Sequence, residues 1–177
     1  TGSGLFFYDG HGFKNYVKAD GLIDNNITAL YCDSQKRLWI GTEAGLSLFH
    51  QNRFRKHPAI RQLKTAKITA LAGDATNQRL WIGTAQKGLY QLAGDIVSRQ
   101  RGLQNIASQR INCLHLDPNK VLWIGTTGGI IQYNDQSVIV FDRSSGLASL
   151  NIQAITSDSK GALWIAHASR GVDRLQN

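Results

Sequence analysis

The chain lacks methionine and long apolar runs, and it is poor in proline and cysteine, with two of each among 177 residues. No stretch approaches the roughly 20 consecutive apolar residues of a membrane helix, and no charged segment followed by an apolar one opens the chain. We therefore expect neither direct membrane insertion nor an export signal within it. Eighteen glycines and 42% hydrophobic residues exclude collagen-like and low-complexity chains. The missing methionine predicts that the chain is part of a longer protein.

Linear signatures of catalysis and metal binding are also absent from the sequence. It contains no H-E-x-x-H, G-x-S-x-G, Walker or G-x-G-x-x-G motif and no EF-hand spacing of acids. Two cysteines cannot supply the four closely spaced ligands of a structural zinc site. We therefore predict no enzymatic activity, no cofactor and no metal. Cys32 and Cys113 are expected to be free and buried, on the innermost strands of two repeats that are not neighbours.

Positive charge exceeds negative charge, with 20 Lys and Arg against 12 Asp and Glu and a net charge of +8. Such a balance raises nucleic acid, anionic lipid or acidic polysaccharide as partners. The densest basic run comprises Arg53, Arg55, Lys56, Arg61, Lys64 and Lys67. No helical spacing gathers these charges, so we predict a solvated outer edge and no nucleic-acid partner. Acidic oligosaccharide remains a ligand class that the charge favours.

A repeated pentapeptide is the decisive feature. Leu-Trp-Ile-Gly-Thr occurs at residues 38–42, 80–84 and 122–126, and residues 163–167 form a degraded fourth copy, Leu-Trp-Ile-Ala-His. The four tryptophans of these copies follow one another at 42, 42 and 41 residues. This period is typical of β-propeller blades.

The similarity extends to both sides of each tryptophan. Upstream, a short β-type run ends at an acidic residue in each copy, namely Asp33, Asp74, Asp117 and Asp158. Downstream, a glycine precedes a third apolar run, and a fourth strand is predicted at 13–17, 53–57, 96–99 and 137–141. The sequence therefore predicts an all-β propeller array of four repeats of about 42 residues, built from four-stranded antiparallel blades.

We expect the whole chain, residues 1–177, to form one array. Residues 1–20 end a blade, because Thr1–Tyr8 matches Thr42–Phe49. Residues 21–60, 61–101 and 102–145 are full repeats, and residues 146–177 are an incomplete last one. The tryptophans, Trp39, Trp81, Trp123 and Trp164, are predicted to pack between blades, with each indole N–H meeting a carbonyl.

The pattern resembles the two-component regulator propeller repeat: Gly-Leu and Asn before the first strand, then Asp, then Leu-Trp-Ile-Gly-Thr, then Gly-Leu and an aromatic residue. This resemblance implies seven-bladed propellers in the extracytoplasmic sensor region of bacterial receptors that signal through a histidine kinase or a diguanylate cyclase. It therefore implies a periplasmic signal-transduction module that senses a ligand or binds a protein.

Four repeats are too few for seven blades, and an open arc leaves apolar end faces uncovered. The alternatives are a small closed ring, two chains associating into an eight-bladed ring, or an arc of a larger propeller. We favour association or a larger propeller. The predicted partners of the array are accordingly a second copy or further blades of the parent protein.

Ligands of propellers usually meet the loops around the central channel, and these loops vary between the copies. The predicted ligand-binding residues are Glu43, Lys87, Arg110, His167 and Arg170. Two other functions stay open. A lyase or hydrolase with a dispersed site predicts that His167, Arg170 and Glu43 converge, and a scaffold that docks proteins predicts an exposed apolar or aromatic patch.

Overall fold

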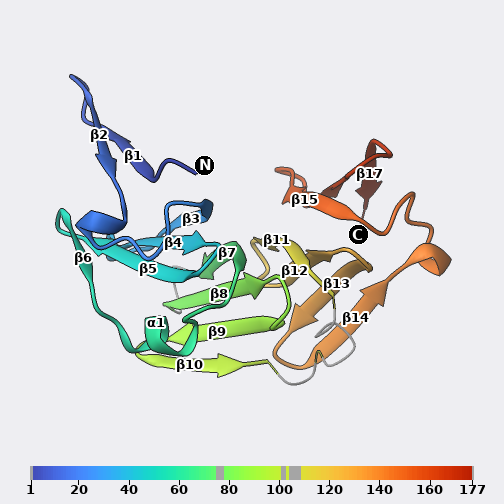
Figure 1. Ribbon diagram of the computed structural model, residues 1–177. Coiled ribbons are helices and arrows are strands. Elements are labelled where there is room, and N and C mark those ends of the chain that lie inside the picture. Colours follow the sequence, from blue (N-terminus) through green and yellow to red (C-terminus); the bar gives the residue numbers. More distant parts are fainter. Residues whose placement is uncertain (1, 75–77, 101–102, 104–108, 177) are drawn as a thin grey trace.

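Figure 1 shows the computed structural model of the protein, which describes residues 2–74, 78–100, 103 and 109–176. The strands form separate antiparallel sheets that follow one another along an open arc. Within the described residues, helix is confined to α1 (Pro58–Gln62) and to the single turns η1 (Lys18–Asp20) and η3 (Arg143–Ser145). The prediction of an all-β propeller array is confirmed.

Three sheets have four strands each, ordered as in the chain. The first contains β3 (Ile27–Cys32), β4 (Leu38–Thr42), β5 (Gly45–His50) and β6 (Arg53–Arg55). The second contains β7 (Ile68–Asp74), β8 (Arg79–Thr84), β9 (Leu89–Ala93) and β10 (Ile96–Arg99). The third contains β11 (Ile111–Leu116), β12 (Leu122–Thr126), β13 (Gly129–Asn134) and β14 (Ser137–Phe141).

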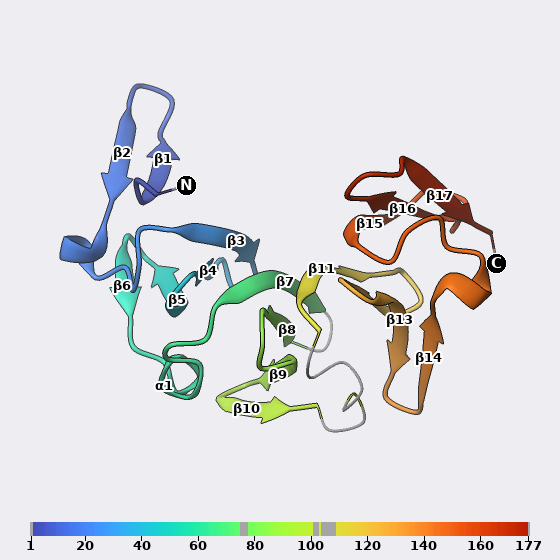
Figure 2. The same cartoon turned by 45° about the vertical axis from the view of Figure 1, so that its right-hand side comes forward.

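Smaller sheets lie at the two ends of the arc (Figure 2). One is the hairpin of β1 (Leu5–Tyr8) and β2 (Phe13–Tyr16). The other contains β15 (Ile152–Ser157), β16 (Leu163–His167) and β17 (Val172–Leu175). The fourth strand predicted at 53–57 is shorter than expected, because β6 stops at Arg55 and the chain enters α1 at Pro58. The predicted boundary at residues 101 and 102 lies outside the described residues.

Each of the first three tryptophans is buried between its own sheet and the next. Trp39 shares a core cluster with Ile68 and Ile82 of the second sheet, and its exposed fraction is 1%. The glycine two residues later allows this contact, since a Cβ on Gly41 would lie 2.7 Å from Cγ2 of Ile68. Gly83 and Gly125 meet Ile111 and Ile152 in the same way. The sheets are therefore held at a distance that leaves no room for a methyl group at these glycines.

The partner of the indole differs from the predicted carbonyl. Nε1–H of Trp39, Trp123 and Trp164 donates to an Oδ2 atom of Asp33, Asp117 and Asp158, at 2.9, 3.1 and 3.0 Å. The Oδ1 atom of the same aspartate accepts a backbone N–H from the turn that leads into the tryptophan strand. We call this pair of contacts the Asp–Trp latch. It fixes the turn and the indole together and satisfies a donor that is deeply buried in Trp39 and Trp123.

The second repeat departs from this arrangement. Its turn has one extra residue, and Asp74 belongs to strand β7. The carboxylate of Asp74, with a side chain only 4% exposed, lies 2.7 Å from the Nζ atom of Lys120 in the third sheet. This carboxylate thus links the second repeat to the third.

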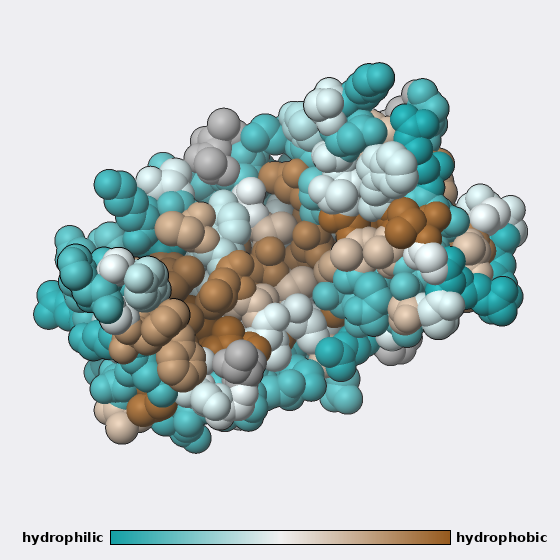
Figure 3. Space-filling view, turned by 90° about the horizontal axis from the view of Figure 1, so that it is seen from above, coloured by the Kyte–Doolittle hydropathy of each residue, from teal (hydrophilic) through white to brown (hydrophobic). Residues whose placement is uncertain are grey.

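The first four-stranded sheet and the last sheet, that of β15–β17, each have an uncovered face. Leu30 is 52% exposed, whereas its equivalents Leu71 and Leu114 are half-buried and Ile155 is 8% exposed. Trp164 is 40% exposed, against 4% or less for the other three tryptophans. Seen from above, apolar residues gather along the middle of the molecule between these ends (Figure 3).

The expectation of two buried cysteines is wrong for Cys32, although both thiols are free as predicted. Cys32 lies on the same uncovered face of β3 as Leu30 and is exposed. Cys113 is half-buried, and this burial raises the pKa of its thiol to about 11.

We expect Asp117→Ala to destabilise the protein by about 2–4 kcal/mol, because it leaves the buried Trp123 indole N–H without its acceptor and opens the turn. Urea unfolding followed by tryptophan fluorescence measures the change. Asp135→Ala is the matched control, since it removes an exposed turn carboxylate paired with Arg79 and should cost about 1 kcal/mol or less. Equal losses in the two variants would contradict a structural role of the latch.

The latch also predicts acid sensitivity. Partial burial raises the pKa of Asp33, but hydrogen bonds from Trp39 and Arg37 outweigh it and hold the pKa below its ordinary value of 3.8. A carboxylate with a lowered pKa in the folded state stabilises the fold above pH 3.8, and this contribution is lost as the pH falls through the folded value. Urea midpoints measured between about pH 6 and pH 2 should fall more steeply for the wild type than for Asp33→Asn. Parallel curves would rule out this contribution.

Candidate ligand-binding site

The loops between second and third strands rest on threonine-locked turns. The hydroxyls of Thr42, Thr84 and Thr126 donate to the carbonyls of Gly45, Gly88 and Gly129, at 2.8, 2.7 and 2.9 Å. Each hydroxyl also accepts a backbone N–H from within the turn. The last residue of the repeated pentapeptide therefore serves to make the loop base rigid.

The predicted ligand-binding residues are placed differently from one another. Glu43 is exposed and its Oε1 lies 2.6 Å from Nζ of Lys67, which joins the loops of the first and second sheets. Lys87 and Arg110 are exposed, and so is Arg170. These side chains stand on loops, as expected, and their role as ligand contacts stays a prediction.

His167 is buried and takes part in an internal pair. It stands where the other copies have threonine, and its Nε2 lies 2.8 Å from Oδ2 of Asp173 on the adjacent strand. The Ala148 backbone N–H, which donates to the same carboxylate, is the main reason that the pKa of Asp173 is lowered. In the described part of the chain, no contact joins His167 to Glu43 or Arg170. The convergence that an enzyme would need is therefore not seen in these contacts.

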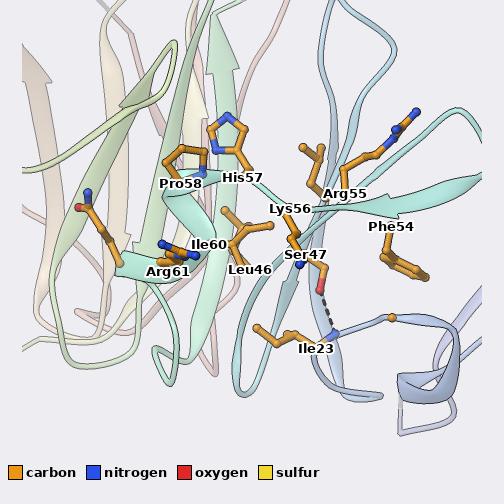
Figure 4. A pocket seen from close by; sticks show the side chains of 13 residues that line it. Ile23, Leu46, Ser47, Phe54, Arg55, Lys56, His57, Pro58, Ile60 and Arg61 are labelled. Carbon is orange, nitrogen blue, oxygen red and sulfur yellow. Dashed lines mark hydrogen bonds between the residues drawn. The ribbon is translucent and has the colours of Figure 1, made fainter.

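A pocket of about 750 Å³ opens beside the first sheet, between β5, β6, α1 and the turn at Gly21 (Figure 4). Its origin is the early end of β6, which pairs with β5 only from Leu48 to His50. In the third sheet the corresponding strand β14 stays paired along all of Ile130–Asn134. The edge of Leu46 and Ser47 thus has no fourth strand beside it. The pocket occupies the space that this strand would fill.

The pocket combines apolar walls with positive charge. Apolar side chains are contributed by Ile23, Leu46, Leu48, Phe54, Pro58 and Ile60. Arg55, Lys56 and Arg61 border it as well, so half of the basic run that the sequence assigns to a solvated edge lies at this pocket. Lys56 and Arg61 are exposed, as predicted. The signal that could have revealed the pocket is Pro58, which ends the predicted fourth strand beside these cations.

His57 closes one side of the pocket. Its Nδ1 accepts the Ala59 backbone N–H at 3.1 Å and so begins α1, which leaves the proton of the neutral ring on Nε2. Nε2 lies 3.1 Å from Oδ1 of Asp95 but is not aligned for a hydrogen bond. Burial lowers the pKa of His57 below 6.5, and Asp95 opposes this effect in part. His57 is therefore a neutral structural cap at neutral pH.

The family model described as "Two component regulator propeller" matches residues 21–44 and 105–128. A histidine kinase, P4, from Formosa agariphila is 26% identical over 167 residues, covering 84% of this chain and 12% of that protein. The extracellular domain of a putative hybrid two component system from B. thetaiotaomicron has a TM-score of 0.82 at 21% identity, over 99% of this chain and 25% of its own. A streptogramin B lyase has a TM-score of 0.68 at 12% identity, over 95% and 59%.

The family model matches the repeat, and the two solved structures share the fold. The chain spans only 12% of the curated relative and 25% of the matched extracellular domain. No helix in the described residues is long and apolar enough to cross a membrane.

Proposed function

We propose that this chain, which carries two-component regulator propeller repeats, is a ligand-sensing part of the periplasmic region of a bacterial signal-transduction receptor. The observation that carries the proposal is the match of the repeat model to two of the blades, together with the propeller fold. The relative named a histidine kinase and the extracellular domain of a two component system support a role in signal transduction. The output domain, a histidine kinase or a diguanylate cyclase, would lie outside this chain.

Sensing is favoured over catalysis by the contacts of the polar loop residues. Glu43 pairs with Lys67 and His167 with Asp173, and no contact among the described residues brings Glu43, His167 and Arg170 together. A propeller lyase shares the fold at 12% identity, which supports a shared architecture and leaves the chemistry open. We therefore propose a binding module without catalytic activity.

A protein-docking role is the second candidate, and the hairpin at the N-terminal end favours it. Phe6, Phe7, Tyr8 and Phe13 of this hairpin are between 51% and 75% exposed. Exposed aromatic side chains of this density are typical of contact surfaces. Docking of a partner and sensing of a ligand are compatible in one receptor module.

The uncovered end faces support the proposal that the array is completed by other blades or by a second copy. Each of the first three tryptophans is buried against the following sheet. Trp164 has no following sheet in the described structure, and it is exposed. Val172 is 60% exposed, whereas its equivalents Leu46, Leu89 and Ile130 are 1% exposed or less. A second copy presenting the face of Leu30 would supply a cover of the kind found inside the array.

We expect the isolated chain to associate into a stable dimer through these faces, as measured by light scattering over a concentration series. Leu30→Asp should shift the mass to that of a monomer, because it places a charge in the newly buried interface. Ile96→Asp is the matched control, since Ile96 is 73% exposed on an outer strand away from the ends. A wild-type monomer at all concentrations would contradict self-association and leave further blades as the cover.

The ligand class is tested with oligogalacturonides as acidic oligosaccharide probes in isothermal titration calorimetry. If the loop residues bind the ligand, Arg110→Ala and Arg170→Ala should each weaken binding by about tenfold, the effect of losing one charge-assisted contact. Arg53→Ala, an exposed charge on β6, should leave binding unchanged. Loss of binding in all three variants would indicate attraction by net charge alone, and absence of binding in the wild type would contradict this ligand class.

A further inference from the structure

We infer that the pocket between β5, β6 and α1 binds a small organic anion with an apolar body, such as an aliphatic or aromatic carboxylate. None of the residues of the proposed sensing surface lines this pocket, and the ligand of the pocket is of a different class. The proposed sensing surface comprises the predicted ligand-binding residues Glu43, Lys87, Arg110, His167 and Arg170. The lining residues, 21, 23, 46–48, 54–58 and 60–62, lie within one repeat and the start of the next. It therefore does not depend on what covers the ends of the array.

The size and the walls of the pocket suit the apolar body of such a ligand. A volume of about 750 Å³ lies within the usual range for small-molecule sites. Leu46 is fully buried under it, and Ile23, Phe54 and Ile60 are half-buried around it. Apolar surface that a ligand covers here leaves water, which is the main driving force for binding.

The charged groups at the pocket determine the sign of the ligand. Lys56 and Arg61 have no ion pair or side-chain hydrogen bond with any other described residue. Among the described residues, no carboxylate lines the pocket. Arg55 is held by Oε1 of Gln51 at 2.6 Å and points away in Figure 4. Two free cations beside an apolar cavity favour a ligand that carries a negative group at one end.

Ser47 adds a directional donor at the floor of the pocket. Its hydroxyl oxygen accepts the Ile23 backbone N–H at 3.0 Å, as drawn in Figure 4. The hydroxyl hydrogen has no acceptor among the described residues, so it can donate to a ligand oxygen. The Ser47 residue is 4% exposed, and a donor in this position gains from a partner that replaces water. Six apolar side chains line the pocket, and they favour an amphipathic acid over a sugar, whose hydroxyls would face these apolar walls.

The test uses octanoate and its neutral counterpart octanamide, with methyl-labelled protein observed by NMR. Octanoate should produce saturable shifts of the Ile23, Leu46 and Ile60 methyl groups, and octanamide should bind about tenfold more weakly because it lacks the charge. Lys56→Gln and Arg61→Gln should each weaken octanoate binding severalfold and leave octanamide binding unchanged. The spectra of these exposed-residue variants also report whether the fold is retained.

Arg53→Gln is the matched control, because Arg53 lies on β6 next to the pocket but does not line it. Equal affinities for octanoate and octanamide would overturn the charge requirement. Shifts at exposed apolar residues such as Ile96 and Val138 instead of the pocket methyls would overturn the site. Arg110→Ala and Arg170→Ala should not change octanoate binding, so failure of this inference is distinguishable from failure of the proposed sensing surface.

Discussion

The array depends on the burial of each of the first three tryptophans against the next sheet, and in three of the four repeats the indole is also held by a hydrogen bond to an aspartate six residues earlier. This hydrogen bond fixes the turn between the first two strands and orients the indole toward the next sheet, so a local contact sets a long-range one. The glycine two residues after the tryptophan then lets an isoleucine of the following sheet approach to within van der Waals contact. The sequence of each blade therefore contains the residues that pack against the next blade. The array is held together by contacts between neighbouring blades.

The same logic explains where the molecule is incomplete. A propeller sheet has two apolar faces, and each needs a neighbour. Inside the array, equivalent residues such as Leu71 and Ile155 are shielded, whereas Leu30 at one end and Trp164 at the other face solvent. The latch of Trp164 to Asp158 is nevertheless formed. The hydrogen bond is thus local to the repeat, and the burial of the indole is the part that a neighbour has to supply.

The sequence predicts what repeats and misses what departs from repetition. The period, the fourth strands at 96–99 and 137–141, and the open ends follow from the aligned copies. The sequence does not identify the partner of the indole, although Asp33 and its equivalents occupy the same position in every copy. An aspartate at a turn is explained by the turn alone, so its side chain gives no separate signal for the indole. Cys32 was expected to be buried because an inner strand is normally covered on both faces, and the missing neighbour leaves it exposed.

Positions that depart from the repeat also supply the ion pairs and the pocket that a regular repeat lacks. His167 replaces the threonine of the other copies and pairs with Asp173. Asp74 precedes a turn with one extra residue, and it pairs with Lys120 of the third repeat. The largest departure is at Pro58, where a missing N–H and a fixed φ stop the fourth strand. That stop leaves Leu46 and Ser47 without a neighbouring strand and brings Lys56 and Arg61 to the vacated edge. A repeat that was perfect here would have filled this space with its own strand, so the capacity to bind a ligand beside the sheet follows directly from the broken ladder.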